Sequence, residues 1–174
     1  MRRALGVDVL LGADVVTVAR RAALDDLAPF RPPHPSLSLT HAGTIAVAAG
    51  VGRRDRSRIG GLGVDYEPAS RCVSARAARL FLDDIERTRV DGHPEPDRSA
   101  ARLALWTVKE AVYKATPDNG THTVAAYHVR EDGTARLRDL LEFRHVTVRF
   151  AEGFLSVAVL DLSAAATEVK RVAS

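Results

Sequence analysis

The segment Trp106-Thr107-Val108-Lys109-Glu110-Ala111-Val112-Tyr113-Lys114 lies in the clearest helical pattern of the chain. Trp106, Glu110 and Lys114 stand four residues apart and therefore share one face of that helix. A Glu and a Lys at this spacing usually form an exposed ion pair worth little. On a face that also carries a tryptophan, we expect partial burial. The two charges then need a partner elsewhere in the fold.

A second segment, Gly63-Val64-Asp65-Tyr66-Glu67, supplies candidates for that partner. In a strand, Asp65 and Glu67 point to the same face and Tyr66 to the other. Two close carboxylates repel each other and stay ionised most easily when a cation lies between them. Mg²⁺ is commonly held by one or two carboxylates plus substrate phosphates. The alternative is the solvated end of a strand with two ordinary acids.

The third segment is Ser38-Leu39-Thr40-His41-Ala42-Gly43. A histidine at the end of a strand, beside hydroxyls and a glycine, can hydrogen-bond a phosphate. A structural histidine in a turn is an equally good interpretation. The sequence has no Gly-x-Ser-x-Gly elbow, no P-loop and no dinucleotide fingerprint, which argues against those classes of enzyme.

Composition limits the class of protein further. The 174 residues are 46% hydrophobic and 27% charged, with a net charge of +3, which is typical of a soluble globular chain of one domain or two small halves. We expect no nucleic-acid partner, because no basic stripe is interleaved with aromatics, and no membrane span. Cys72 is the only cysteine and is expected to be a small packed residue. A single cysteine cannot form an internal disulfide, and this favours a reducing cytoplasm.

The remaining pattern predicts an α+β fold with antiparallel strands. We expect 44–66 to form a hairpin, and 99–115 to be a helix with Ser99 as its cap. Gly6-Val7-Asp8 echoes Gly63-Val64-Asp65, which fits two related halves or coincidence. The expected elements are helices at 17–28, 70–90 and 99–115, and strands at 4–11, 36–39, 44–51, 59–66, 121–129, 134–141, 145–150 and 154–160.

In this order, the three segments resemble the 4′-phosphopantetheinyl transferase superfamily, and its surfactin-synthetase-activating type in particular. Ser38 to His41 is similar to the family's Ser-x-Ser-His, and Gly63 to Glu67 to its Gly-(Val/Ile)-Asp-x-Glu. Trp106 to Lys114 matches Trp-x-x-Lys-Glu-Ala-x-x-Lys at every fixed position. The resemblance covers roughly residues 18 to 160.

This resemblance implies a fold of two related α/β halves with antiparallel sheets, a pseudo-dimer. Residues 1–60 would be a reduced amino-terminal half and 61–174 the half with the metal site, together one compact unit. The implied reaction moves 4′-phosphopantetheine from coenzyme A to a serine of an apo acyl or peptidyl carrier protein, releasing adenosine 3′,5′-bisphosphate. It requires Mg²⁺, with Mn²⁺ as an alternative, and serves fatty acid, polyketide or nonribosomal peptide synthesis. We expect a monomer.

The resemblance also implies roles for individual residues. Asp65, Glu67 and Glu110 would bind the metal, and Glu110 would also accept the proton of the attacking serine. Lys114 would assist the departing phosphate, and His41 would hold the nucleotide's phosphate. Arg20 and Arg21 lie in a segment similar to the Ala-Arg-x-Ala-Leu helix of relatives, and Arg31 precedes a proline as a basic residue does there; surface arginines are the alternative. The full set expected to contact coenzyme A is Ser38, Thr40, His41, Lys109, Lys114, Arg20, Arg21 and Arg31.

The chain departs from the family pattern in its short first half. The shorter, trimeric holo-carrier-synthase type would place its metal ligand at Asp8, but Asp8 is too far from Glu110 along the chain, which favours Asp65. Two further alternatives are an inactive relative that binds coenzyme A or a carrier protein, and a Mg²⁺-dependent nucleotide hydrolase. The arginine-rich segment 53–58 is a candidate contact for an acidic carrier, or simply a solvated turn.

Overall fold

Hydrogen bonding between strands divides the chain into two antiparallel sheets. The computed structural model describes residues 7–11, 37–43, 45–51, 56–138 and 140–162, with the backbone alone for 7–11 and 56. One sheet has the order β1-β3-β2 and the other β4-β8-β7-β6-β5. Their strands are β1 (Val7–Leu11), β2 (Leu37–Ala42), β3 (Ile45–Val51), β4 (Ile59–Pro68), β5 (Tyr127–Val129), β6 (Thr134–Leu137), β7 (Leu141–Arg149) and β8 (Gly153–Asp161). The predicted α+β class with antiparallel sheets is confirmed.

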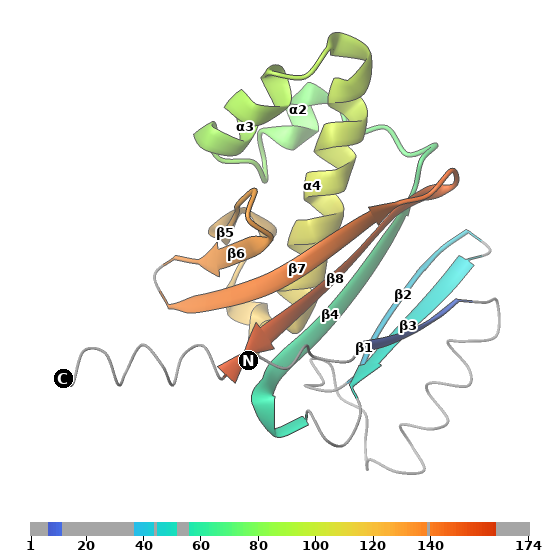
Figure 1. Ribbon diagram of the computed structural model, residues 1–174. Coiled ribbons are helices and arrows are strands. Elements are labelled where there is room, and N and C mark those ends of the chain that lie inside the picture. The colour runs from blue at the N-terminus through green and yellow to red at the C-terminus, as the bar shows by residue number, and fades with distance from the viewer. Residues whose placement is uncertain (1–6, 12–36, 44, 52–55, 139, 163–174) are drawn as a thin grey trace.

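Helix α4 (Glu95–Ala115) crosses one face of the five-stranded sheet, and the shorter helices α2 (Ala75–Ala78) and α3 (Asp84–Asp91) pack beside its first half (Figure 1). The apolar side of α4 buries a core against the sheet, as the spacing of its apolar residues requires. That core includes Leu103, Val108 and Val112 of the helix, with Phe143 and Ala158 of the sheet.

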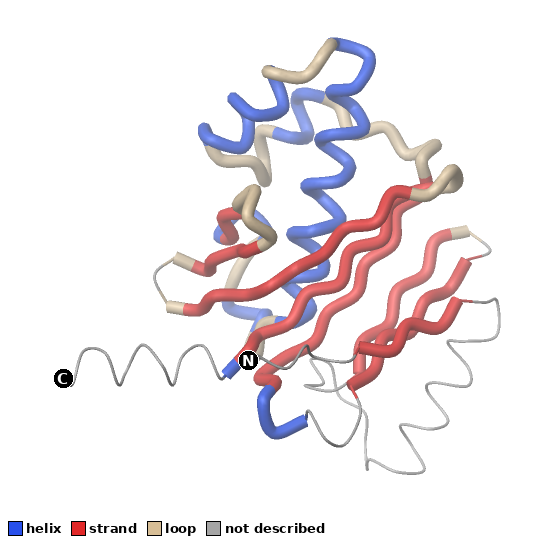
Figure 2. The backbone as a smooth tube through the Cα atoms, viewed as in Figure 1, coloured by secondary structure: helices blue, strands red, loops and turns tan. Residues whose placement is uncertain are grey.

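The three-stranded sheet lies on the other side of β4 (Figure 2). Val47 and Ala49 of β3 pack there against Leu62 and Val64 of β4 in a second core. β4 is an edge strand, and backbone N–H groups at an edge need acceptors. Side-chain hydroxyls of β2 provide them, because Val64 N donates to Ser38 Oγ (2.9 Å) and Tyr66 N to Thr40 Oγ1 (3.4 Å). We call this contact between β2 and β4 the seam.

The expected hairpin over 44–66 is wrong. β3 pairs with β1 and β2, whereas β4 pairs with β8, about 90 residues later. Both strands exist close to where they were expected, but they belong to different sheets. Strand pairing over such a separation is decided by burial on the two faces of β4, which local patterns do not show.

The helices also begin at other residues than expected. The predicted helix 70–90 is two helices, because Ser74 caps α2 and Asp83 caps α3 with a capping box. α4 begins at Glu95 after Pro94, so Ser99 lies inside the helix and is not its cap. Proline suits the first turn, where the missing N–H is not needed.

The carboxyl-terminal strands follow the expected order with shifted bounds. The stretch 121–129 is mostly not strand, since η2 (Asn119–Thr121) and η3 (Val124–Ala126) precede the three-residue β5. The expected helix 17–28 lies outside the described residues. Cys72 is exposed and not packed, with its Sγ 3.4 Å from Ser99 Oγ. Among the described helices, none is both long and apolar enough to cross a bilayer.

Candidate active site between β4 and α4

Two glycines of β4 allow α4 to lie directly against the strand. A Cβ at Gly61 would stand 1.7 Å from the carbonyl oxygen of Ala115, and one at Gly63 would stand 1.8 Å from that of Ala111. Only glycine therefore permits this approach. It brings the side chains that follow Gly63 on the strand next to those of Glu110 and Lys114 on the helix.

Asp65 is the centre of the resulting cluster, and its carboxylate is only half satisfied. Its Oδ1 accepts hydrogen bonds from Lys114 Nζ (2.7 Å) and Thr40 Oγ1 (3.3 Å). Its Oδ2 is buried and has no hydrogen-bond partner among the described residues. Burial raises the pKa of Asp65; Lys114 opposes this shift and Glu67 adds to it. An unpartnered buried carboxylate oxygen is costly unless something else binds it.

Glu67 is held by two donors at a single oxygen. Its Oε1 accepts from Trp106 Nε1 (2.9 Å) and from the Arg71 guanidinium. The Arg71 guanidinium carbon also lies 5.5 Å from the centre of the Trp106 ring. Phe81 packs edge-on against the same ring, with 4.9 Å between the ring centroids. Trp106 is thus fixed with its N–H aimed at Glu67.

Glu110 completes the acidic set, and it lies near both strand carboxylates. Burial raises its pKa; Asp65 and Glu67 raise it further, against the opposing charges of Lys114 and Arg71. The expected helix face is turned toward the strand acids: Trp106 donates to Glu67 and Lys114 to Asp65, and Glu110 lies between them on that face. The cluster holds three carboxylates and two cations.

The donor set fits a hard divalent cation, although the described residues contain no group of three acidic, histidine or cysteine side chains already arranged to hold a metal ion. Carboxylate oxygens are the protein ligands that Mg²⁺ prefers, and phosphates of a substrate usually supply the rest. The buried Oδ2 of Asp65 is the atom that most needs such a partner. Asp65, Glu67 and Glu110 are the residues that would hold the ion.

Ser38 and Thr40 have structural contacts that differ from the expected role in coenzyme binding. Both are buried, and both hydroxyls accept backbone N–H groups of β4 across the seam. Thr40 also donates to Asp65, so it touches the site by orienting a carboxylate. These contacts support β4, and the predicted contact of Ser38 and Thr40 with coenzyme A stays a prediction.

His41 is exposed at the end of β2. It follows Thr40 directly, so its side chain leaves the strand on the face opposite to the seam. Within the described part of the chain, no hydrogen bond or ion pair joins it to the acidic cluster. Its role in holding a phosphate stays a prediction.

Lys109 lies apart from the acidic cluster, and its surroundings give no support to the prediction that it binds coenzyme A. Its side chain is fully buried and its ammonium meets Glu86 Oε2 (2.7 Å) and the carbonyl oxygens of Phe81 and Tyr127 (both 2.6 Å). Those three acceptors use all three N–H donors of a lysine. Burial nevertheless lowers its pKa, against the opposing effect of Glu86. Lys109 ties α4 to the neighbouring backbone.

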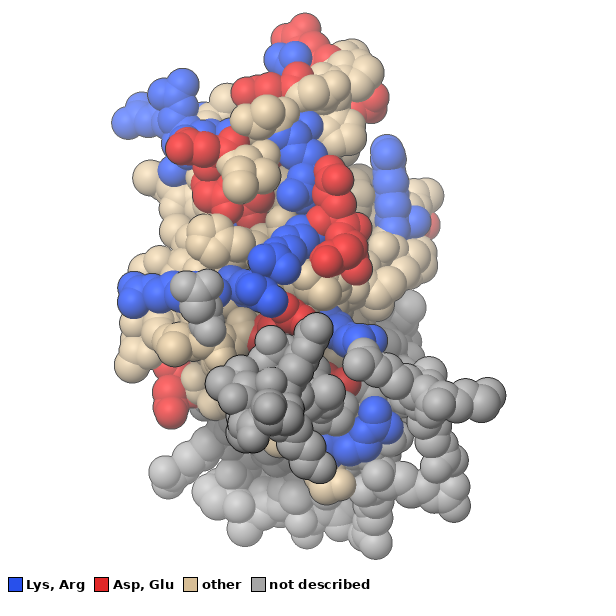
Figure 3. All heavy atoms as spheres, turned by 60° about the vertical axis from the view of Figure 1, so that its left-hand side comes forward, with Lys and Arg blue, Asp and Glu red and all other residues tan. Residues whose placement is uncertain are grey.

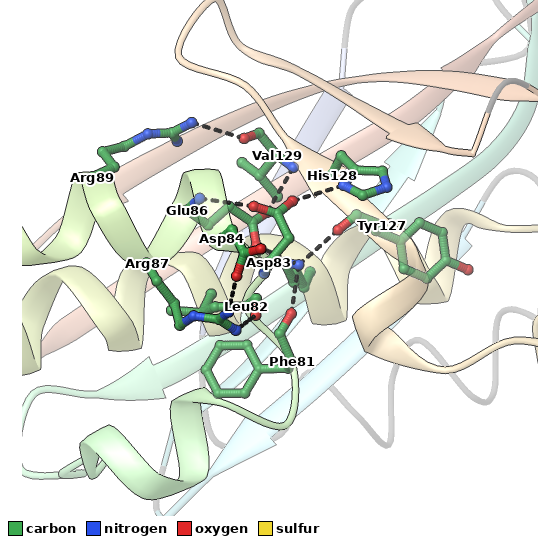
Figure 4. A network of polar contacts seen from close by, with 11 residues as sticks. Phe81, Leu82, Asp83, Asp84, Glu86, Arg87, Arg89, Tyr127, His128 and Val129 are labelled. Atoms are coloured by element: carbon green, nitrogen blue, oxygen red, sulfur yellow. Dashed lines mark hydrogen bonds and ion pairs between the residues drawn. The ribbon is translucent and has the colours of Figure 1, made fainter.

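Sequence reasoning missed Glu86, the partner of Lys109. Figure 4 shows it between α3 and β5: Glu86 Oε1 accepts from Val129 N (2.8 Å), and Oε2 accepts from Asp83 N (3.0 Å). Asp83 in turn accepts from Glu86 N and contacts His128 Nδ1 at 2.7 Å. The Asp-x-x-Glu spacing of a capping box was the signal that could have marked this helix start.

Arg71 was also missed, since nothing in its local sequence distinguishes it from other arginines. It follows β4 closely enough to reach back four residues to Glu67. The predicted contacts Arg20, Arg21 and Arg31 lie outside the described residues, as does the first half of the arginine-rich segment 53–58. On the face seen in Figure 3, basic and acidic side chains are interspersed over the described elements, so that face has no large basic field.

A pocket of about 460 Å³ lies beneath the first half of α4, apart from the acidic cluster. Alanines of α4 form one wall, and Phe154 and Arg149 of the sheet face them. None of the residues predicted to be functional lines it. The chemistry expected from the sequence is therefore concentrated between β4 and α4.

A known protein family matches this part of the chain. The profile of the 4′-phosphopantetheinyl transferase superfamily matches residues 61–161, from the first close glycine of β4 to the end of β8. No curated protein sequence matches the chain. The matched range covers more than half of the chain and contains all three acids and both Arg71 and Lys114. The chain belongs to the 4′-phosphopantetheinyl transferase superfamily.

Proposed function

We propose that this protein transfers the 4′-phosphopantetheine group of coenzyme A to a serine of an apo acyl or peptidyl carrier protein, in a Mg²⁺-dependent reaction of the surfactin-synthetase-activating type. Its superfamily consists of phosphopantetheinyl transferases, which use coenzyme A and act on carrier proteins. The observation that carries the proposal is the half-satisfied carboxylate of Asp65, with Glu67, Glu110 and Lys114 around it.

The reaction forms a bond between the serine oxygen and the β-phosphorus of coenzyme A, and breaks the bond from that phosphorus to the bridging oxygen. Adenosine 3′,5′-bisphosphate leaves with the bond's electrons. Phosphoryl transfer depends mainly on positioning and on neutralising charge. Mg²⁺, held by Asp65, Glu67 and Glu110, would neutralise charge on the diphosphate.

Glu110 is the base in this proposal, taking the serine proton directly or through a water. Without a metal, burial and the neighbouring acids raise the pKa of Glu110, and a bound Mg²⁺ would oppose this shift, so the role of base rests on the position of Glu110 beside the strand acids. Lys114 stabilises the departing phosphate. Its ammonium already lies at the cluster, within 2.7 Å of Asp65 Oδ1.

Other parts of the proposal rest on the resemblance. His41, Arg20, Arg21 and Arg31 would contact the nucleotide phosphates, and Mn²⁺ would substitute for Mg²⁺. Residues 1–60 and 61–174 would be the two related halves of a monomer. The exposed Cys72 suits a cytoplasmic enzyme, because an exposed thiol persists best in a reducing compartment.

The test is to incubate the protein with coenzyme A, Mg²⁺ and several apo carrier proteins, and to look for a phosphopantetheine adduct by mass spectrometry. We expect an adduct on the carrier serine that is lost with EDTA and in Asp65→Asn. Release of nucleotide without an adduct would identify a hydrolase instead. Binding of coenzyme A with no chemistry on any carrier would identify an inactive relative.

A further inference from the structure

The acidic cluster is nearly neutralised by the chain's own cations. Asp65, Glu67 and Glu110 contribute three negative charges, and Lys114 and Arg71 contribute two positive charges, which leaves −1. We propose that Arg71 and Lys114 make binding of the divalent cation and of the diphosphate mutually dependent, so that neither binds tightly alone. This inference rests on the proposed function and says how that same site is loaded.

The charge balance explains the dependence. A divalent cation alone would change the cluster from −1 to +1, with two cations already in contact with its ligands. The diphosphate diester of coenzyme A alone would change it from −1 to −3. Both together return it to −1. Because like charges repel at this range and opposite charges attract, each ligand relieves the cost of the other.

The contacts show which oxygens the chain's cations hold. Lys114 donates to Oδ1 of Asp65, and Arg71 to Oε1 of Glu67. Each of these two cations therefore covers an oxygen that an incoming metal ion could use. A phosphate oxygen is an equally good acceptor for either group, and a guanidinium can bind phosphate through two N–H groups. A bound diphosphate thus draws the cations off the carboxylates.

Arg71 is the better placed of the two to move. Its side chain is 48% exposed, against 29% for Lys114, and it lies on the segment that follows β4. Its stacking on Trp106 leaves the guanidinium at the rim of the cluster. Lys114 is instead held on a helix and also donates to the carbonyl of Val64. Arg71 is therefore the residue whose removal isolates the effect.

The test measures binding of Mn²⁺ from the electron paramagnetic resonance signal of the free ion, with and without coenzyme A and with no carrier protein present. In the natural protein we expect coenzyme A to tighten Mn²⁺ binding beyond what coenzyme A binds in a protein-free control. In Arg71→Gln we expect Mn²⁺ alone to bind about tenfold more tightly, since one nearby positive charge is gone, and the effect of coenzyme A to shrink. Arg71→Lys, which keeps the charge, should retain the natural coupling.

Arg76→Gln is the matched control, because it removes the same charge from an exposed arginine of α2 and should behave as the natural protein. Unchanged or weaker Mn²⁺ binding in Arg71→Gln would overturn the inference while leaving the proposed function intact. If Glu67→Gln and Asp65→Asn bind Mn²⁺ as the natural protein does, the metal site itself is wrong. Far-ultraviolet circular dichroism checks that each variant folds.

Discussion

Lys109 and Glu110 are neighbours on α4, yet they belong to two charged clusters of opposite character. Lys109 and Glu86 form a closed pair, 0% and 1% exposed, in which every ammonium proton has an acceptor. Glu110 belongs to an open cluster, in which acids outnumber cations and one carboxylate oxygen of Asp65 has no partner among the described residues. The same residue types thus stabilise the fold in one place and are available for chemistry in the other.

The two clusters differ in whether a charge or a hydrogen-bonding atom is left for a ligand to bind. A buried ion pair with complete hydrogen bonding has nothing to gain from another molecule, whereas an acidic cluster with a raised pKa gains from any cation. We expect the closed pair to govern stability and the open cluster to govern activity. Four predictions test this division, from the largest expected effect to the smallest.

Glu110→Gln should abolish transfer while the fold remains. The amide has nearly the same shape but cannot accept the serine proton or bind a cation as well, so we expect a loss of about 10³-fold or more in the rate of adduct formation. Fluorescence of Trp106, which contacts the same cluster through Glu67, serves as the check on local structure. A variant with the full rate would remove Glu110 from the reaction.

Lys109→Met should lower the free energy of unfolding by about 3–5 kcal/mol, because it leaves Glu86 charged and buried without its partner. Urea denaturation measures this. The double variant Glu86→Gln with Lys109→Met should recover much of the loss, since the uncompensated charge is gone. If the two substitutions were instead simply additive, the pair would not be the source of the stability.

Thr40→Val should cost about 1 kcal/mol of stability, because Tyr66 N loses its acceptor and Asp65 a donor across the seam. Ser38→Ala removes the corresponding bond to Val64 N and is the matched comparison, as it does not touch Asp65. Only Thr40→Val should also lower the transfer rate. Equal effects of the two on transfer would mean that the seam acts through strand position alone.

The smallest effect is a stabilisation that depends on pH. The pKa of Glu110 is raised above its ordinary value of 4.5, so the folded protein binds a proton more readily than the unfolded chain does. Its ionisation therefore costs stability once the pH rises above the ordinary value and through the raised one. With EDTA present, Glu110→Gln should gain up to about 1 kcal/mol at neutral pH, allowing for solvent screening, and nothing at about pH 4. A loss at neutral pH would show that attraction to Lys114 outweighs the repulsion.

Local rules predicted the open cluster well. Alternation along β4 placed Asp65 and Glu67 on one face, and four-residue spacing placed Glu110 and Lys114 opposite them. The same rules could not assign Lys109, because its partner Glu86 lies on another helix and depends on how α3 folds back on α4. Arg71 was missed for a related reason. Its place in the cluster depends on the contact between Trp106 of α4 and Glu67 of β4, which lie far apart in the sequence.

The positions of the strands were predicted better than the strands with which they pair. Strands were expected at 44–51 and 59–66 and lie at 45–51 and 59–68, but the sheet that β4 joins is decided by its pairing with β8, far along the chain. The seam contacts of Ser38 and Thr40 could not be predicted for the same reason: hydroxyls that suit a phosphate also suit the free edge of a strand, and the local sequence does not show where β4 lies.

The contact of Gly61 and Gly63 with α4 has a consequence for how this enzyme can vary. Peptide groups alone separate the strand and the helix there, so the spacing between the acids of β4 and Glu110 is set by main-chain dimensions. Repacking of the core cannot retune that spacing, and a single added methyl group would displace both clusters of α4 together. The distance between the strand acids and Glu110 is thus independent of substitutions in the surrounding core. It is lost when either glycine is replaced.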